Sequence, residues 1–303
     1  MTKTFLNYPD WQDTADTVHL MLQMAGKVKV ARCNKRPEWA HVRLYLTVDG
    51  FTTGLIPGDE FPFQIVFNFR EHQVEFKNSE GVNTSIPLQD GVSIAMFYER
   101  FVNALELIGS PTNINTSPQE FYDPIDFDKD EIHHTYDENA VMTWLQNLHF
   151  AYLPLMKFLA PFRGKVDNPA YYFGTMDLSG CIYSGEYVPL EAADRISQFA
   201  YDERCFEIGY WPGDIHIPLA SFYVMPYPFI DDVGENEKLL QPYKARFVPQ
   251  KKEFFLTLED AFSYPNPVDS VVQFFNSAFD IVQNLHKWKD IEWLKKPLVY
   301  REE

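Results

Sequence analysis

The chain has 303 residues, of which 46% are hydrophobic and 16% aromatic, enough to bury one large core or two ordinary ones. Its formal net charge of −17 repels phosphate backbones and anionic lipid, which argues against nucleic acid and membrane surfaces as partners. Three cysteines are too few and too scattered for a disulfide framework, and neither a signal peptide nor a membrane span is indicated. We therefore expect a soluble cytoplasmic protein.

The first part of the chain predicts a helix, three strands and a second helix. Asp13 or Thr14 can cap a first helix that runs to about Val30. Apolar and polar residues then alternate in three segments, which predicts strands at 42–48, 61–69 and 72–77. A loop leads to the second helix, which starts near Gly91. The order favours an antiparallel sheet.

We predict a linker at residues 111–136, because prolines interrupt this segment and acidic residues dominate its second part. From Glu120 to Glu138, eight acidic residues face one lysine. Asp137 can cap the long helix that follows, and Asn266-Pro267 is a strong start signal for the last helix. Between these helices, strand-like patterns cover residues 171–183, 205–210, 222–227 and 253–258.

The architecture is predicted to be duplicated. The apolar spacing of the helix at residues 94–108 recurs at residues 268–282, and Gly26-Lys27 has a counterpart in Gly164-Lys165. We predict an α+β fold of two related α-β-β-β-α halves with antiparallel sheets flanked by helices. The predicted divisions are a first half at 1–110, a linker at 111–136, and a second half with longer loop insertions at 137–303. The two halves are expected to form one compact body.

Two segments carry polar groups suited to binding a ligand. His19, Gln23 and Lys27 follow each other at helical spacing and form one polar stripe, which could line a cleft or be an ordinary solvent face. Residues 209–214 read Gly-Tyr-Trp-Pro-Gly-Asp, which places rings and an acid at the end of a strand. That pattern fits the rim of a pocket, and it also fits a turn with Trp211 packed beneath it.

The acidic segment also suggests metal binding as an alternative. Asp126, Asp128, Asp130 and Asp137 match four positions of a calcium-binding loop, but Glu131 stands where that loop needs glycine. A solvated acidic linker explains the same residues. No HExxH, GxSxG, Walker or GxGxxG motif is present. An enzyme built on this chain would therefore use residues without a local signature.

Many spaced residues together resemble a bacterial family known only as a domain of unknown function, number 5996. The matching positions run through most of the chain: Trp11, Thr14, His19-Leu20, Gln23, Gly26-Lys27, 39–42, 44–45, 50–53, His72, Pro124-Ile125, Phe127-Asp128, Asp130, His133, 136–137, 140–141, 163–165, Gly174, 177–178, 184–185 and 209–213. The resemblance carries no function. It implies that Asp128, His133 and Tyr136 belong to a family pattern, so that their segment is more than a linker.

The chain also departs from that pattern, and each departure removes or moves ionisable groups. The family commonly has His at Ala170, Arg at Ile182, Asp at Asn68, and a His-Glu pair at Glu203-Arg204. The resemblance therefore implies a somewhat divergent member, which binds without turnover or has altered chemistry.

Our leading hypothesis is a cytosolic protein, a binder or an enzyme, that holds a small polar or anionic ligand in a pocket between the two halves. The expected lining residues are His19, Gln23, Lys27, His41, His133, Tyr136, Lys165, Asp177 and Trp211. One alternative is a non-catalytic protein–protein interaction module that uses its acidic surface. Another is a metal-dependent enzyme that uses His133 and Asp128. The sequence leaves the cofactor and the oligomeric state open.

Overall fold

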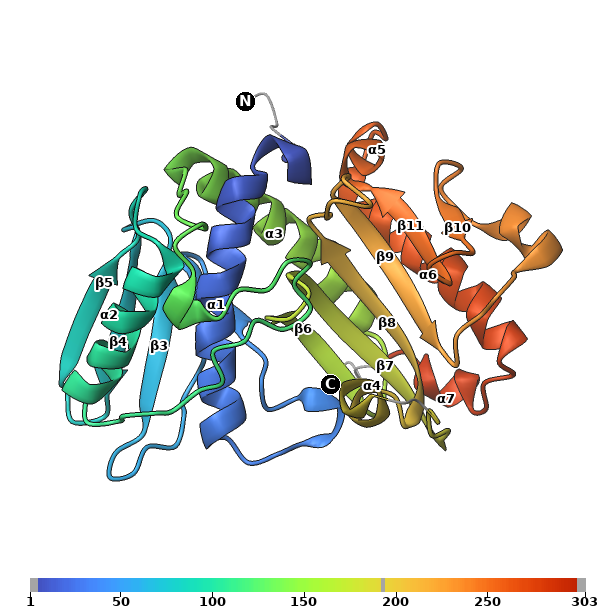
Figure 1. The fold of residues 1–303 in the computed structure, drawn as a ribbon. Coiled ribbons are helices and arrows are strands. Elements are labelled where there is room, and N and C mark those ends of the chain that lie inside the picture. Colours follow the sequence, from blue (N-terminus) through green and yellow to red (C-terminus); the bar gives the residue numbers. More distant parts are fainter. Residues whose placement is uncertain (1–4, 192–193, 299–303) are drawn as a thin grey trace, which may run out of the picture. The chain divides into compact units, whose positions relative to one another are not determined.

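The computed structural model describes residues 5–191 and 194–298, and it shows an α+β fold with two antiparallel sheets (Figure 1). The predicted fold class is confirmed. The chain divides into two compact units. Unit 1 comprises residues 1–147, 170–177 and 214–218, and unit 2 comprises residues 148–169, 178–213 and 219–303. The predicted halves and linker divide the chain along the sequence. That the two halves are related in structure stays a prediction.

Unit 1 contains a five-stranded sheet in which each strand pairs with the next along the chain. Its strands are β1 (Tyr45–Leu46), β2 (Gly50–Thr52), β3 (Phe63–Asn68), β4 (Gln73–Asn78) and β5 (Asn83–Pro87). Phe63, Ile65 and Phe67 of β3 are buried and their neighbours half-buried. This confirms the predicted strand with one buried face, because successive side chains of a strand point to opposite faces.

The prediction of three strands for this sheet was wrong, because the structure adds β2 and β5. The sequence predicted a loop where β5 lies. Gly50 begins β2 and has a φ of 152°. A Cβ at Gly50 would stand 2.1 Å from the carbonyl oxygen of Phe67, so glycine allows the close approach of the two strands. The predicted strand at 42–48 shrinks to β1, and Leu44 instead forms an isolated antiparallel bridge with Tyr171.

Helix α1 (Gln12–Arg32) is buried from Thr14 to Lys29, on all its faces. Its predicted caps were wrong, because Trp11 occupies the cap position and the Thr14 hydroxyl accepts the N–H of Asp137 at 3.0 Å. Helix α2 (Ile94–Leu107) lies over β4 and β5 (Figure 1), with Phe101 against Phe76 at a ring separation of 5.1 Å.

Helix α3 (Glu138–Leu159) begins where the sequence predicts. Asp137 Oδ1 accepts the N–H groups of Asn139 at 2.8 Å and Ala140 at 3.2 Å, which confirms the predicted cap. The helix continues through Pro154. Within unit 1, Trp144 of α3 packs on Trp11 at 5.4 Å.

The second sheet, most of which belongs to unit 2, has six strands in the order β10-β11-β9-β8-β7-β6. Its strands are β6 (Val166–Tyr172), β7 (Asp177–Tyr187), β8 (Glu203–Trp211), β9 (Ser221–Tyr227), β10 (Arg246–Val248) and β11 (Glu253–Thr257). Four predicted segments correspond to β6 through β9 and β11. The segment predicted as one strand at 171–183 is two strands separated by a turn, and β10 was not anticipated.

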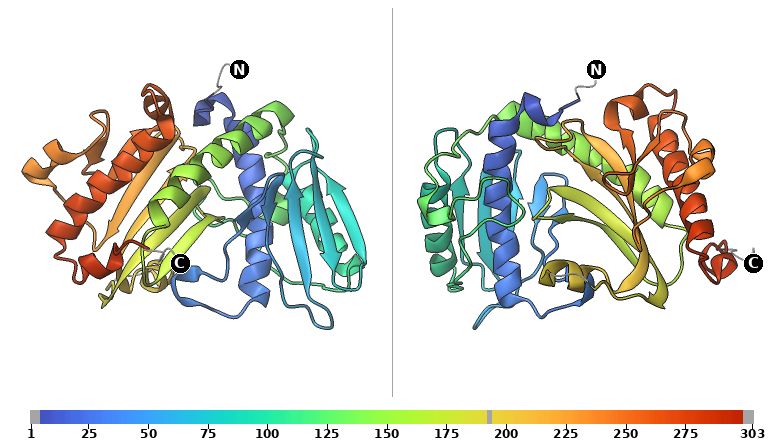
Figure 2. Two further views of the ribbon diagram at one scale, coloured as in Figure 1. Left: turned by 180° about the vertical axis from the view of Figure 1, so that it is seen from behind. Right: turned by 45° about the vertical axis from the view of Figure 1, so that its right-hand side comes forward.

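Helix α6 (Pro267–Leu285) starts at the proline that the sequence indicates, although the Asn266 side chain bonds Asp269 and does not cap the backbone. Phe279 of α6 and Phe158 of α3 both pack on Phe206 of the sheet, at 5.0 and 5.9 Å. Figure 2 shows the two helices side by side on this sheet. The shorter helices are η1 (Tyr8–Asp10), η2 (Pro37–Trp39), η3 (Phe127–Lys129), α4 (Arg195–Ala200), η4 (Gly234–Leu239), α5 (Leu258–Phe262) and α7 (Ile291–Leu294).

The matched apolar spacing of α2 and α6 describes two helices that each bury one face. The sheets they cover differ in strand number and order. The internal duplication stays a prediction.

Candidate functional site

The polar stripe on α1 lies inside unit 1, and its side chains are committed to backbone groups. The amide of Gln23 donates to the carbonyl of Gln119 and accepts from its N–H, both at 2.8 Å. Lys27 Nζ donates to the carbonyl of Ser117 at 2.7 Å. The stripe therefore fixes the segment around residues 117–119 to the buried helix, because these backbone groups have found partners in its side chains.

His19 completes the stripe and donates from Nε2 to the carbonyl of Phe173 at 2.7 Å. Burial lowers the pKa of His19 to about 4, so the ring is neutral near pH 7. Burial also lowers the pKa of Lys27. Close packing at the same place explains the neighbouring glycine, since a Cβ at Gly26 would stand 2.0 Å from the ring of Phe173. Gly26 therefore has a packing role.

His133 differs from Gln23 and Lys27 because one of its two ring nitrogens has no hydrogen-bond partner in the described part of the chain. Nδ1 of His133 lies 2.7 Å from Oδ2 of Asp130, whose side chain is fully buried. The His133 side chain is 14% exposed. Within residues 5–191 and 194–298, Nε2 of His133 has no hydrogen-bond partner. A carboxylate on Nδ1 holds the proton there and leaves the Nε2 lone pair as an acceptor.

The backbone around this pair is fixed to the start of α2. Asp130 Oδ1 accepts the N–H groups of Ile132 and His133, both at 3.0 Å. The carbonyls of Asp130 and His133 accept the N–H groups of Ala95 at 2.9 Å and Ile94 at 3.0 Å. These bonds satisfy two N–H groups of the helix's first turn and place its positive end beside the buried carboxylate. The pair is therefore held on a rigid support.

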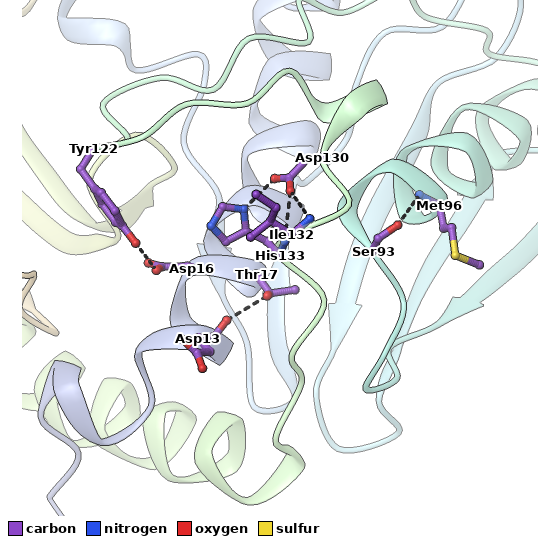
Figure 3. Close-up of polar contacts among 9 residues, drawn as sticks. All are labelled: Asp13, Asp16, Thr17, Ser93, Met96, Tyr122, Asp130, Ile132 and His133. Carbon is purple, nitrogen blue, oxygen red and sulfur yellow. Dashed lines mark hydrogen bonds and ion pairs between the residues drawn. The ribbon is translucent and has the colours of Figure 1, made fainter.

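A buried carboxylate, Asp16 of α1, lies near His133 (Figure 3). It accepts hydrogen bonds from the hydroxyls of Tyr8 and, at 2.8 Å, Tyr122. Burial raises the pKa of Asp16, while the two tyrosine bonds and the charge of His133 work in the opposite direction. The ring of Phe121 packs edge-on against His133 at 5.4 Å. Tyr122 is exposed, so this part of the site borders solvent.

Tyr136 and Asp177 also lie in unit 1, and neither is close-bonded to His133. The Tyr136 hydroxyl hydrogen-bonds Nδ1 of His72 at 3.0 Å, and burial raises the pKa of Tyr136. Asp177 is buried and accepts the hydroxyl of Thr175. His41 is buried too, in the loop after α1, where its ring stacks on Trp39.

Lys165 and Trp211 belong to unit 2. Lys165 Nζ pairs with Glu203 at 2.9 Å and lies 4.0 Å from the centre of the Tyr183 ring. Trp211 ends β8, with the ammonium of Lys251 5.7 Å from its ring centre. That these two residues line one pocket with the seven residues of unit 1 stays a prediction.

Sequence reasoning missed Asp16, Tyr8, Tyr122 and the role of Asp130. Asp130 carried a signal, because it stands three residues before His133 and belongs to the family-like block. Asp16 carried none. Its partner Tyr122 is 106 positions away, and only the fold brings the two together.

The acidic segment shows contacts other than those of a calcium loop. Asp126 pairs with Lys129 at 2.7 Å, Asp137 caps α3, and Asp128 is exposed. Among the described residues, no group of three or more His, Cys, Asp or Glu side chains could hold a metal ion. It is Asp130, and not Asp128, that pairs with His133.

In the part of the chain that the structure describes, no helix has the length and apolar character needed to cross a membrane. Searches of curated proteins and of solved structures found no match. A family model does match, over residues 4–295. The chain belongs to the Family of unknown function (DUF5996), as the resemblance of its motifs indicated.

Proposed function

We propose that this protein binds a small polar ligand beside His133 in unit 1, and that the Asp130–His133 pair exchanges a proton with it. The observation that carries the proposal is the 2.7 Å contact between Asp130 Oδ2 and His133 Nδ1, with Nε2 unbonded among the described residues. A histidine held in this way has the geometry of a general base.

The chemistry follows from the tautomer. Asp130 stabilises a proton on Nδ1 and also the positive charge that forms when Nε2 accepts a second proton. A hydroxyl, an amine or a water molecule at Nε2 could therefore lose a proton to His133. The hydroxyls bonded to Asp16 supply further polar groups nearby.

The surrounding charges favour a neutral or cationic ligand over an anionic one. Two exposed carboxylates, Asp13 and Asp123, add negative charge to this region. Together with burial, the charge of Asp13 raises the pKa of Asp16 and that of Asp123 raises the pKa of Tyr122. The lysines expected to attract an anion are engaged, since Lys27 binds the Ser117 carbonyl and Lys165 pairs with Glu203. We place the protein in the cytoplasm because its three cysteines are free thiols, which a reducing compartment favours.

The test compares two neighbouring histidines. His133→Asn removes the unbonded nitrogen, and His134→Asn makes the same change at an exposed side chain one position away. Native mass spectrometry of untagged protein would first look for a retained ligand. A thermal-shift screen of small amines, alcohols and polar metabolites would follow. We expect hits that H133N loses and H134N keeps. Hits that H133N retains would overturn the proposal.

Proton transfer needs its own readout. For any ligand found, turnover or ligand-proton exchange would be measured against pH for the parent protein and for Asp130→Asn. We expect D130N to bind while losing the proton-transfer step, because an amide no longer holds the proton on Nδ1. Equal rates in both proteins would leave a binding function only.

One observation favours the interaction module as a second candidate. Of the eight acidic residues in the 120–138 segment, six are exposed: Glu120, Asp123, Asp128, Glu131, Asp137 and Glu138. Such a surface suits a basic partner. Reversing the charge of Asp123, Asp128 and Glu131 to lysine should then abolish capture of one stoichiometric protein. Capture that survives the reversal would count against this candidate.

A further inference from the structure

The loop between α1 and β1 carries a second group of polar residues, away from the proposed function. Residues 27–43 contain six of the chain's 26 basic residues and a single acid, Glu38, in a protein of net charge −17. Arg32 is engaged with Asp59, and Lys29 is buried against the carbonyls of Arg43 and Thr53. The remaining basic side chains of the loop itself are Lys35 and Arg36.

These two side chains are exposed. Among the described residues, neither forms a hydrogen bond or an ion pair through its charged group. Two adjacent cations without counter-charges are unusual on so acidic a protein, where carboxylates outnumber basic groups by 43 to 26. They leave a locally positive loop.

His41 adds a hydrogen-bond donor to this loop. The N–H of Arg36 donates to Nδ1 of His41 at 3.2 Å, so Nδ1 is an acceptor and the ring proton resides on Nε2. His41 is 6% exposed, and its Nε2 is buried without a partner among the described residues. A buried N–H group without an acceptor is rare in folded proteins, because its lost bond to water is not replaced.

The loop backbone holds these groups in place. Glu38 and Trp39 both adopt left-handed conformations, with φ of 48° and 55°. Ala40 and Val42 donate to the carbonyls of Pro37 and Trp39, both at 3.0 Å. Two successive non-glycine residues in this region persist only where the surrounding structure fixes them.

We propose that the loop at residues 35–41 is a binding site for a small oxyanion, a phosphate or carboxylate group, which accepts the Nε2 proton of His41 and pairs with Lys35 and Arg36. The anion supplies the acceptor that the ring lacks and the negative charge that the two cations lack. Burial lowers the pKa of His41, and the charges of Lys29, Lys35 and Arg36 lower it further. The ring is therefore a neutral donor near pH 7, and a bound anion would raise that pKa.

The test uses inorganic phosphate and acetate as probes of the full-length protein. Binding would be followed by NMR of the ¹⁵N-labelled histidine rings. We expect a saturable shift of the His41 Nε2 resonance on addition of phosphate. Tighter binding of phosphate than of acetate would assign a phosphate site, and equal binding would assign a general oxyanion site. The absence of any saturable shift with either probe would overturn the proposal.

Three variants separate the site from general charge. Lys35→Gln combined with Arg36→Gln should weaken phosphate binding by about tenfold or more, because charge-assisted bonds are the strong ones. Lys289→Gln combined with Lys296→Gln changes the net charge equally at exposed positions of unit 2 and should leave binding unchanged. Equal losses in the two double variants would show attraction by charge alone and would overturn the proposal.

His41→Asn tests the ring donor. The asparagine oxygen can replace Nδ1 as acceptor for the Arg36 N–H, while the Nε2 donor is lost. Phosphate binding, measured by calorimetry, should be weaker in H41N than in the parent protein. The melting temperature should stay within the range that the parent shows in different buffers. Unchanged affinity in this folded variant would remove His41 from the site.

Discussion

The α1 stripe and the Asp130–His133 pair are both polar groups in unit 1, and their hydrogen bonds separate them. The polar side-chain atoms of Gln23 and Lys27 form hydrogen bonds with the backbone of residues 117–119. His133 bonds Asp130 through Nδ1, while its Nε2 has no partner among the described residues. The difference teaches that spacing on a helix identifies polar positions, while the count of satisfied bonds identifies those that can still bind. The stripe should therefore govern stability, and the pair should govern function.

The largest stability effect is expected from acid acting on His19. Its pKa is near 6.5 in the unfolded chain and about 4 in the fold, so between these values the unfolded state binds the extra proton. Stability is then present above pH 6.5 and is lost as pH falls to 4, by about 3 kcal/mol. Urea unfolding at both pH values would measure this loss.

His19→Asn should lose less stability over the same pH interval than the parent protein. Asp16, whose raised pKa acts with the opposite sign, is present in both proteins, so their difference isolates His19. His134→Asn serves as the control. Identical pH slopes in parent and H19N would contradict the prediction.

Gln23→Leu should lower the free energy of unfolding by about 2 kcal/mol, because it leaves the N–H and the carbonyl of Gln119 without their partners. The control is Gln12→Leu, since the Gln12 amide makes only a 3.4 Å contact with Tyr122. Chemical denaturation would compare them. A loss no larger for Q23L than for Q12L would show that water replaces the amide freely.

Asp130→Asn should cost about 1 kcal/mol of stability, because the amide oxygen can still accept the N–H groups of Ile132 and His133. The lost charge removes only the attraction to His133 and to the α2 terminus. The ring ¹⁵N spectrum should meanwhile show the His133 proton moving from Nδ1 towards Nε2. A spectrum like that of the parent would mean that Asp130 does not set the tautomer.

His133→Asn should have the smallest effect on stability, about 0.5 kcal/mol or less, since half of the ring's bonding capacity is unused. Its melting temperature would be compared with that of His134→Asn. A large fall in H133N alone would place His133 with the stripe as a structural residue and would end the contrast between the two regions.

The sequence predicted those elements whose signals are local. The period of β3, the Asn266-Pro267 start of α6 and the Asp137 cap of α3 each depend on a few adjacent residues. The sequence did not predict β5, because residues 83–87 show no alternation of large apolar side chains. It also left open a solvent face on α1, whereas every face of that helix is buried from Thr14 to Lys29. The residues of a helix do not show which other segments will cover its faces.

The candidate site divides in the same way. His133 and Asp130 are three residues apart, and a family-like block already marked both. Tyr122 reaches Asp16 only because the segment before α3 packs against α1, while Tyr8 reaches it from η1, eight residues earlier in the chain. Nor did the sequence indicate the partners of Lys27 and Lys165, because their acceptors stand 90 and 38 residues away along the chain.

Unit 1 is built from three separate stretches of the chain, so the order of synthesis affects when it can be completed. Its main part ends at Asn147, yet Ala170–Asp177 and Asp214–Pro218 also belong to it. Tyr171 packs on Phe51 at 4.5 Å, and the Phe173 carbonyl is the partner of His19. A nascent chain of 147 residues therefore lacks the acceptor of His19. Unit 1 can be completed only after residue 218 has been synthesised, when residues 148–169 and 178–213 of unit 2 are already present.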